Sequence, residues 1–191
     1  MRQFLMPALL WFSILGSGLL AGVYFAFSAF VMTALGRLDQ ATGIAAMNAV
    51  VQAARGWIGT PYVHQASVRG TGCDCLGLVR GVWRELYGAE PEPVPAYSMD
   101  WGEAAREERL WAAALRHLAE VTGRAPAPGD VLLFRMRPGA AAKHLGIASG
   151  AGTFLHAYSG HAVAESRLTP PWARRVVAYF RFPARGRRKG F

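Results

Sequence analysis

The N-terminal part of the chain limits the fold most, because it holds a long run without charge. Residues 3–36 contain no Asp, Glu, Lys, Arg or His over 34 positions. About 20 apolar residues are enough for one helix to cross a bilayer. A cleaved signal peptide has a shorter apolar core and a small-residue cleavage site, for which Ala26-Phe27-Ser28 is a poor match. We therefore expect residues 1–50 to form one uncleaved transmembrane helix and a linker.

A cysteine stands at the predicted start of a helix in the next part of the chain. After Gly72-Cys73-Asp74-Cys75, apolar residues recur at helical spacing as far as Gly88, namely at Leu76, Val79, Val82, Trp83, Leu86 and Tyr87. Cys75 then lies on the first turn, where unpaired backbone N–H groups and the helix dipole favour a thiolate. Because the thiolate is the nucleophilic form, Cys75 is a candidate catalytic residue; a buried structural cysteine is the alternative.

Two histidines follow in a predicted β-hairpin. A short apolar strand at residues 131–134 comes first, and two further strands then carry His144 and His156 on either side of a glycine-rich turn. With a loop at residues 149–151, the two histidines lie directly opposite each other on one face, and a slip of one residue would separate them. A cysteine, a histidine base and a group that orients the base make up a nucleophilic site.

Other interpretations of these side chains compete with catalysis. Cys73, Cys75 and the two histidines could ligate zinc, but the Cys-x-Cys spacing is not that of common zinc sites. We therefore expect no metal and no cofactor. Taken alone, Tyr62 is better explained by core packing and His64 by a structural role. Cys73 lies too close to Cys75 in sequence for a good disulfide geometry.

Five motifs, in this order, resemble those of the NlpC/P60 family, which are papain-like cysteine peptidases of bacterial cell walls. They are Trp57-Ile58-Gly59-Thr60-Pro61-Tyr62, Asp74-Cys75, Pro128-Gly129-Asp130, His144-Leu145-Gly146-Ile147 and Leu155-His156-Ala157. The resemblance covers residues 51–183 and is greatest to the branch carried by phages and gene transfer agents, in which Leu-Gly-Leu follows the cysteine. It implies an α+β domain with a papain-like fold, helices packed on an antiparallel sheet, preceded here by the transmembrane helix.

The family resemblance also implies a role for each of five residues. Cys75 is the nucleophile, His144 is the general base and then the general acid, and His156 orients His144. Tyr62 lines the site and helps to polarise the scissile carbonyl. Asp74 helps to hold a free amino terminus of the peptide stem.

The implied activity is that of an endopeptidase that hydrolyses amide bonds in peptidoglycan stem peptides, at the bond between γ-D-glutamate and a diamino acid. Leu76 stands where many relatives have Ser, so the substrate terminus is less well specified than the chemistry. Two alternatives remain. One is an amidase or transferase with the same Cys-His-His triad; the other is a non-catalytic module, either membrane-tethered and wall-binding or structural in a phage particle. The presence of all three triad residues favours the enzyme.

Helices precede strands along the rest of the chain, as in an α+β domain. We expect one helix over residues 44–57 and a stiff proline-rich connector at residues 91–95. Asp100 caps a further helix with Glu103 three residues on. That helix ends at Gly123 and buries Leu110, Trp111, Ala114, Leu115 and Leu118. The last strand covers residues 174–182.

The net charge of +9 does not by itself indicate nucleic-acid binding. Four of the positive charges lie in a Gly-containing tail, residues 184–191, at Arg185, Arg187, Arg188 and Lys189. A solvated tail explains them, as does attraction to anionic envelope or lipid head groups. We expect no specific nucleic-acid binding, because the sequence lacks the pattern of a recognition helix or of an aromatic platform.

The N-terminal segment has a resemblance of its own. Residues 21–32 and 43–48 are similar to the first helix of an anthrone-oxygenase-like membrane family. Members of that family have several transmembrane helices and this chain offers one, so no function is carried over. An in-frame fusion near residues 48–51 explains the junction, and a gene-model artefact would give the same sequence.

The charges beside the apolar run leave its orientation open, with Arg2 and the amino terminus on one side and Arg37 on the other. A wall-degrading enzyme needs the wall side, so we expect a single-pass membrane protein with its catalytic domain there. The alternative is a domain that stays in the cytoplasm until a particle assembles. The expected partners are peptidoglycan stem peptides, the membrane and, in that alternative, components of a phage tail or gene transfer agent particle.

Overall fold

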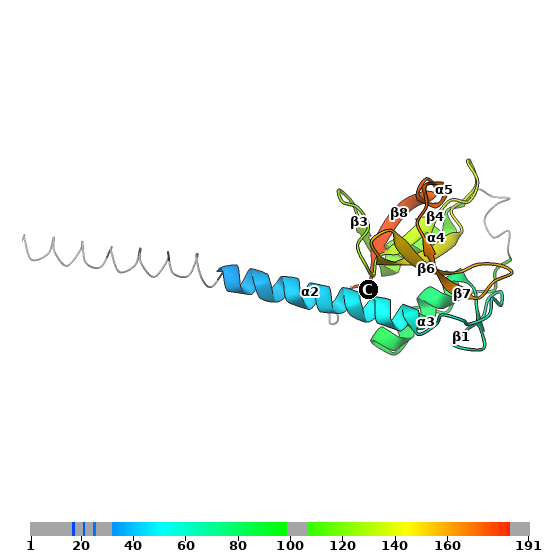
Figure 1. Cartoon of the computed structure of the whole chain (residues 1–191), viewed down its shortest axis with the longest axis horizontal. Helices are drawn as coiled ribbons and strands as arrows, with labels where there is room; N and C mark the ends of the chain where they lie inside the picture. The colour runs from blue at the N-terminus through cyan, green and yellow to red at the C-terminus, as the bar shows by residue number, and fades with distance from the viewer. Residues whose placement is uncertain (1–16, 18–20, 22–24, 26–31, 99–106, 184–191) are drawn as a thin grey trace, which may run out of the picture. The chain divides into compact units, whose positions relative to one another are not determined.

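The computed structural model describes residues 17, 21, 25, 32–98 and 107–183 of the 191-residue chain (Figure 1). The chain divides into two compact units, Met1–Ala45 and Ala46–Phe191. Within the described ranges, no helix is long and apolar enough to cross a membrane. The predicted transmembrane run, residues 3–36, lies mostly outside these ranges, and the basic tail, residues 184–191, lies entirely outside them.

Helix α2 (Met32–Arg55) contributes its C-terminal turns to the second unit. The sequence predicts a helix over residues 44–57, whereas the observed helix starts earlier, since no proline interrupts this stretch. Val50, Val51 and Ala54 are buried, and so is Trp57 in the turn that follows. This apolar face joins the main core of the domain.

The described part of the second unit is built around a six-stranded sheet with the order β3-β8-β4-β5-β6-β7. Every strand pair in it is antiparallel. A separate two-stranded sheet, β1-β2, precedes the helix that carries Cys75. The strands are β1 (Ser67–Val68), β2 (Gly72–Cys73), β3 (Ala119–Val121), β4 (Val131–Phe134), β5 (His144–Gly150), β6 (Thr153–Ala157), β7 (Val163–Arg167) and β8 (Val176–Arg181).

The two faces of the sheet bury different clusters, because successive strand residues point to opposite sides. On one face, residues such as Leu133, Ile147 and Leu155 pack with the helices α3 (Cys75–Tyr87) and α4 (Arg109–His117). On the other face, a smaller cluster packs against Trp172 of the short helix α5 (Pro170–Ala173). The buried members of this cluster are Leu132, Phe134, Ala148 and Phe154.

The predicted start and end of the cysteine helix are confirmed. α3 begins at Cys75, and its C-cap is Gly88, whose φ of 89° is one that residues other than glycine rarely adopt. Residues 131–134 form the predicted strand, and the two histidines lie on the two strands of the predicted hairpin. The expected α+β class, with helices on an antiparallel sheet, is therefore confirmed.

The helix predicted to end at Gly123 is shorter than expected. α4 ends at His117 because Leu118 takes an extended conformation (φ −112°, ψ 162°) and β3, which follows, pairs with β8. Leu115, predicted to be buried, is 45% exposed, whereas Leu110 is buried as predicted. The predicted cap formed by Asp100 with Glu103 lies outside the described residues.

The register of the β5–β6 hairpin differs from the prediction. Ile147 pairs with Leu155 and Ala148 with Phe154, and an irregularity follows between Ala148 and Gly150. The predicted register pairs His144 with His156, and the observed register differs from it by two residues. The predicted direct opposition is therefore wrong, but a shift of two residues preserves the face, so the predicted common face is correct.

Candidate active site

Cys75 is the first residue of α3, and the residue before it caps the helix. Asp74 is the N-cap with an extended backbone, and its Oδ1 accepts a hydrogen bond from the Gly77 N–H at 2.8 Å. Such a cap satisfies one of the N–H groups that have no intrahelical acceptor at a helix start. The preceding loop packs so closely that a Cβ on Gly77 would lie 1.9 Å from the carbonyl oxygen of Ala66. The cap and the loop together fix the position of Cys75.

The second carboxylate oxygen of Asp74 joins separate segments of the domain. Oδ2 accepts hydrogen bonds from the Gln65 N–H at 2.8 Å and from the Tyr97 hydroxyl at 2.6 Å, and His64 Nδ1 lies 3.6 Å from it. The Tyr97 carbonyl oxygen lies 2.9 Å from His64 Nε2 and accepts from the Gln65 side chain at 2.7 Å. The carboxylate is only 3% exposed, so Tyr97 and the 64–65 loop enclose it.

Backbone pairing holds Tyr62 in place. Tyr62 forms a parallel bridge to Cys73, and its N–H donates to the carbonyl oxygen of His161 at 3.0 Å. Burial, followed by the nearby Cys75 and Asp74, raises the pKa of Tyr62. The hydroxyl therefore stays protonated at neutral pH and is able to donate a hydrogen bond.

His144 and His156 form a hydrogen-bonded pair on the sheet. Nε2 of His144 lies 3.0 Å from Nδ1 of His156, and the planes of the two rings are inclined at 78°. Nε2 of His156 lies in turn 3.1 Å from Oγ of Ser166. Both histidines are buried. Since its Nε2 is engaged by His156, His144 retains Nδ1 for another partner.

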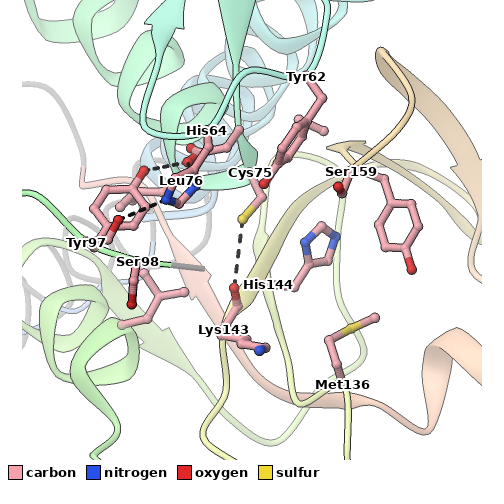
Figure 2. Close-up of a pocket in the computed structure, with 14 residues that line it drawn as sticks. Tyr62, His64, Cys75, Leu76, Tyr97, Ser98, Met136, Lys143, His144 and Ser159 are labelled. Carbon is pink, nitrogen blue, oxygen red and sulfur yellow. Dashed lines mark hydrogen bonds and ion pairs between the residues drawn. The ribbon is translucent and has the colours of Figure 1, made fainter. Parts of the chain in front are cut away.

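Cys75 and His144 line the same pocket, of about 230 Å³ (Figure 2). The Cys75 sulfur lies 3.9 Å from the carbonyl oxygen of Lys143, the residue before His144, and Figure 2 draws this contact as a dashed line. Tyr62 and Asp74 line the same pocket. Four of the five predicted site residues are therefore brought together, and His156 reaches this group through its bond to His144.

Burial keeps the Cys75 thiol and the His144 imidazole neutral. Burial, followed by the Asp74 carboxylate, raises the pKa of Cys75 to about 12, although the backbone N–H groups of Leu145, Leu76 and Cys75 itself lower it. Burial, followed by His156, lowers the pKa of His144 to about 3. Loss of solvation therefore outweighs the N–H groups of the helix start, which by themselves favour a thiolate. The resting pair is a thiol and an imidazole.

Aromatic rings enclose the two histidines. The ring centroid of Trp172 lies 5.8 Å from that of His144 and 5.1 Å from that of His156. The Phe154 ring lies 4.5 Å from the His156 ring, and the Tyr158 ring lies 5.9 Å from the His144 ring. Burial among apolar rings disfavours the charged form of an imidazole. It is also the main reason why the pKa of His156 falls to about 4, with His161 as the second cause.

Three residues of the site were not predicted from the sequence. Tyr97 follows the proline-rich connector, Ser166 lies on β7 and Trp172 lies on a helix of four residues. Tyr97 and Ser166 carry no local pattern, because only the tertiary fold brings them to Asp74 and His156. For Trp172 a signal existed, since a proline at the first helical position marks a helix start.

Cys73 and Cys75 differ in how deeply they are buried. Among the described residues, no group of three or more His, Cys, Asp or Glu side chains is arranged to hold a metal ion. Cys73 is fully buried in the main core, and burial, followed by Asp74, raises its pKa to about 12. Cys75 is only partly buried and lines the pocket, so it is the thiol that a substrate can reach.

The sequence profile of the NlpC/P60 family matches residues 59–181, a stretch that holds all five predicted site residues and more than half of the chain. The chain belongs to the NlpC/P60 family. This confirms the family resemblance found in the sequence. Its phage and gene transfer agent branch, and the resemblance of the N-terminal segment, stay predictions.

Individual relatives share part of this NlpC/P60 chain. The gamma-DL-glutamyl hydrolase of Bacillus subtilis (strain 168) is 31% identical over 134 residues, which is 70% of this chain and 29% of the relative. An NlpC/P60 family protein from Bacillus cereus ATCC 10987 has a TM-score of 0.53 at 19% identity, over 72% of this chain and 40% of that one. A protein from Staphylococcus aureus Mu50, described as similar to lipoprotein and of the NLP/P60 family, has a TM-score of 0.51 at 19% identity. The match covers 72% of this chain and 41% of that one. The two structures show a shared fold, and the chain spans less than half the length of these relatives.

Proposed function

We propose that this NlpC/P60 domain is a cysteine peptidase that hydrolyses amide bonds in peptidoglycan stem peptides, between γ-D-glutamate and a diamino acid. The observation that carries the proposal is the shared pocket of Cys75 and His144, with Nε2 of His144 engaged by His156 at 3.0 Å. The name of the Bacillus subtilis relative, a gamma-DL-glutamyl hydrolase, supports the choice of bond.

The neutral resting pair determines how the first proton moves. With the pKa of Cys75 near 12 and that of His144 near 3, the thiol keeps its proton until a substrate arrives. His144 Nδ1 then takes that proton as the sulfur attacks the amide carbonyl carbon, in one general-base step. The C–N bond breaks, and the leaving amine receives the proton from His144. Water then hydrolyses the thioester, with His144 as base, and restores the thiol.

Two donors are available for the oxyanion that forms during the attack. The N–H of Cys75 lies at the helix start, where backbone N–H groups lack intrahelical acceptors. The Tyr62 hydroxyl lines the same pocket and stays protonated, because its pKa is raised. Each such donor commonly stabilises the transition state by about 3 kcal/mol. We assign Tyr62 and the Cys75 N–H to this role.

Asp74 is suited to bind a free amino group at the end of the stem. A carboxylate has about four lone-pair sites, and three are used by Gly77, Gln65 and Tyr97. Asp74 lines the pocket and is nearly enclosed, so an ammonium group that reached it would be held by a poorly screened charge. This arrangement favours a stem with a free amino terminus over one joined to its sugar.

We also propose that residues 3–36 anchor the domain in a membrane, with the domain on the wall side. The support is the uncharged run of 34 positions and the need of such an enzyme to reach the wall. Retention in the cytoplasm until a phage or gene transfer agent particle assembles is the alternative. Digestion of the domain by protease added to intact spheroplasts supports the wall side, whereas complete protection contradicts it.

The proposed activity is tested with three substrates and the full-length chain. They are a free stem tetrapeptide that contains γ-D-glutamate and a diamino acid, the same peptide acetylated at its amino terminus, and the same stem joined to its disaccharide. Products are identified by mass spectrometry. We expect the free stem to be cut between γ-D-glutamate and the diamino acid, and the acetylated stem to be cut much more slowly.

Two results would overturn the proposal. Release of an intact stem from the disaccharide would identify an amidase. No cleavage of any substrate by a folded protein whose Cys75 reacts with an alkylating reagent would favour a non-catalytic module.

A further inference from the structure

The contacts of His156 extend beyond His144 to a third side chain on the next strand. In the β6–β7 pair, Phe154 is opposite Ser166 and His156 is opposite Ala164. Ser166 is therefore a diagonal neighbour of His156 on the same face of the sheet, within reach of a long side chain. Its Oγ lies 3.1 Å from Nε2 of His156. The sheet thus aligns Ser166, His156 and His144 in one hydrogen-bonded row.

The proposed role of His144 as general base determines which ring nitrogens in this row carry a proton. To take a proton from Cys75, Nδ1 of neutral His144 must be bare, so its proton is on Nε2. That Nε2–H donates to Nδ1 of His156, the atom 3.0 Å away. His156 is then protonated on Nε2 and must donate from there. Among the described residues, the hydrogen-bond partner of this nitrogen is Ser166 Oγ.

Burial makes this last hydrogen bond important. His156 is 4% exposed, and its ring lies against Phe154 and Trp172. A buried N–H without an acceptor costs free energy. Without Ser166, His156 would be more stable with its proton on Nδ1, donating to Nε2 of His144. That arrangement puts the His144 proton on Nδ1, and the base is lost.

We propose that Ser166 is a positioning residue, whose Oγ accepts the Nε2–H of His156 and thereby keeps Nδ1 of His144 bare toward Cys75. This inference rests on the proposed function, because it assigns His144 as the base. No bond is made or broken at Ser166 itself. Its role is to select one of two proton arrangements in the row.

The experiment compares Ser166→Ala, Ser166→Thr and Ser149→Ala in the full-length chain. Threonine keeps the hydroxyl and suits a strand. Ser149 supplies a matched control, because it is a buried serine whose Oγ bonds to Thr153 Oγ1 at 3.0 Å in the same sheet and not to a histidine. Two quantities are measured: kcat and KM on the free stem peptide, and the imidazole ¹⁵N shifts of both histidines, which report the protonated nitrogen without any need for activity.

We expect Ser166→Ala to lower kcat about 10-fold, as removal of one hydrogen bond to a catalytic group does, with KM unchanged. We expect its His156 proton to move from Nε2 to Nδ1, while Ser166→Thr and Ser149→Ala behave as the wild type. A wild-type His156 protonated on Nδ1 would overturn the proposal. So would a Ser166→Ala protein with unchanged proton positions, whether or not kcat falls. If the wild type cleaves nothing but the shifts respond as expected, the role of Ser166 in the proton arrangement stands and the proposed function fails.

Discussion

Nε2 of His144 lies 3.0 Å from Nδ1 of His156 although the two residues are not cross-strand partners. They lie on adjacent strands of one sheet and on the same face, two residues out of direct opposition. A diagonal pair of this kind is within reach of two imidazole side chains. The antiparallel sheet itself therefore fixes the His144 ring through its Nε2 and leaves Nδ1 outside that bond. The aromatic rings around the pair help to bury both imidazoles.

The first prediction concerns the reactivity of Cys75 toward iodoacetamide at different pH values. Because the pKa of Cys75 is raised to about 12 and only the thiolate reacts, the alkylation rate should rise about tenfold per pH unit between pH 7 and 10. Peptide mapping by mass spectrometry assigns the modified residue. A Cys73→Ala protein serves as the control and should show the same rates. A rate that is constant between pH 6 and 8 would instead indicate a thiolate–imidazolium pair and would contradict the neutral resting state.

The second prediction concerns stability in mild acid. The pKa values of His144 and His156 in the folded protein, about 3 and about 4, are below the ordinary 6.5. The unfolded chain therefore binds protons first as the pH falls, and the free energy of unfolding should decrease below pH 6.5. Each histidine contributes a slope of at most about 1.4 kcal/mol per pH unit.

Urea unfolding of the wild type and of His156→Gln between pH 7 and 5 measures this slope. In this pH range the carboxylates of the unfolded chain, with pKa values near 4.5, stay largely ionised. The measured slope therefore reports mainly on the histidines. The variant should lose roughly half of the slope. A free energy of unfolding that is independent of pH in the wild type would show that the histidines are not buried in the neutral form.

The sequence predicted which residues lie together at the pocket better than it predicted the elements around them. The helix that starts at Cys75 was predicted from the sequence, because glycine and apolar spacing mark its limits locally. The strands that carry His144 and His156 were predicted for the same reason. Strand β3 was not, because the residues after His117 continue a helical pattern and only pairing with β8 makes them extended. The hairpin register was missed by two residues, since an irregularity at the turn carries no sequence signal. Tyr97 and Ser166 reach Asp74 and His156 only through contacts across the fold, which spacing along the chain cannot show.

The third prediction concerns the close packing behind the cysteine helix. A Cβ on Gly77 would lie 1.9 Å from the carbonyl oxygen of Ala66. Because this oxygen belongs to the backbone, it cannot move aside as the end of a flexible side chain could. We expect Gly77→Ala to destabilise the domain by about 3 kcal/mol, at the upper end of the usual cost of overpacking. Gly43→Ala is the matched control, because it is also helical and has nothing within 4 Å of an added Cβ. It should be neutral or stabilising by up to about 1 kcal/mol. Equal effects of the two substitutions in thermal unfolding would contradict the close approach.

The fourth prediction concerns the hydrogen bond from the Tyr97 hydroxyl to Asp74 Oδ2, at 2.6 Å. Tyr97→Phe removes a donor to a buried carboxylate and should cost about 1.5 kcal/mol of stability, the lower value for a hydrogen bond to a charged group. Tyr158→Phe removes a hydroxyl from a side chain that is 41% exposed and should cost less than about 0.5 kcal/mol. Urea unfolding at pH 7 compares the two proteins. If Tyr97→Phe is as stable as Tyr158→Phe, Tyr97 does not hold the 64–65 loop and Asp74 together.

The most direct test of the central claim, that Cys75 is the nucleophile of a stem-peptide hydrolase, is the initial rate on the free stem tetrapeptide for three proteins. They are the wild type, Cys73→Ala and Cys75→Ala, all as full-length chains with matched circular dichroism spectra. We predict that the wild type and Cys73→Ala cut the bond between γ-D-glutamate and the diamino acid at similar rates, because Cys73 is buried in the core. Cys75→Ala should show no cleavage above background. Cleavage of that bond by Cys75→Ala at the wild-type rate would contradict the account.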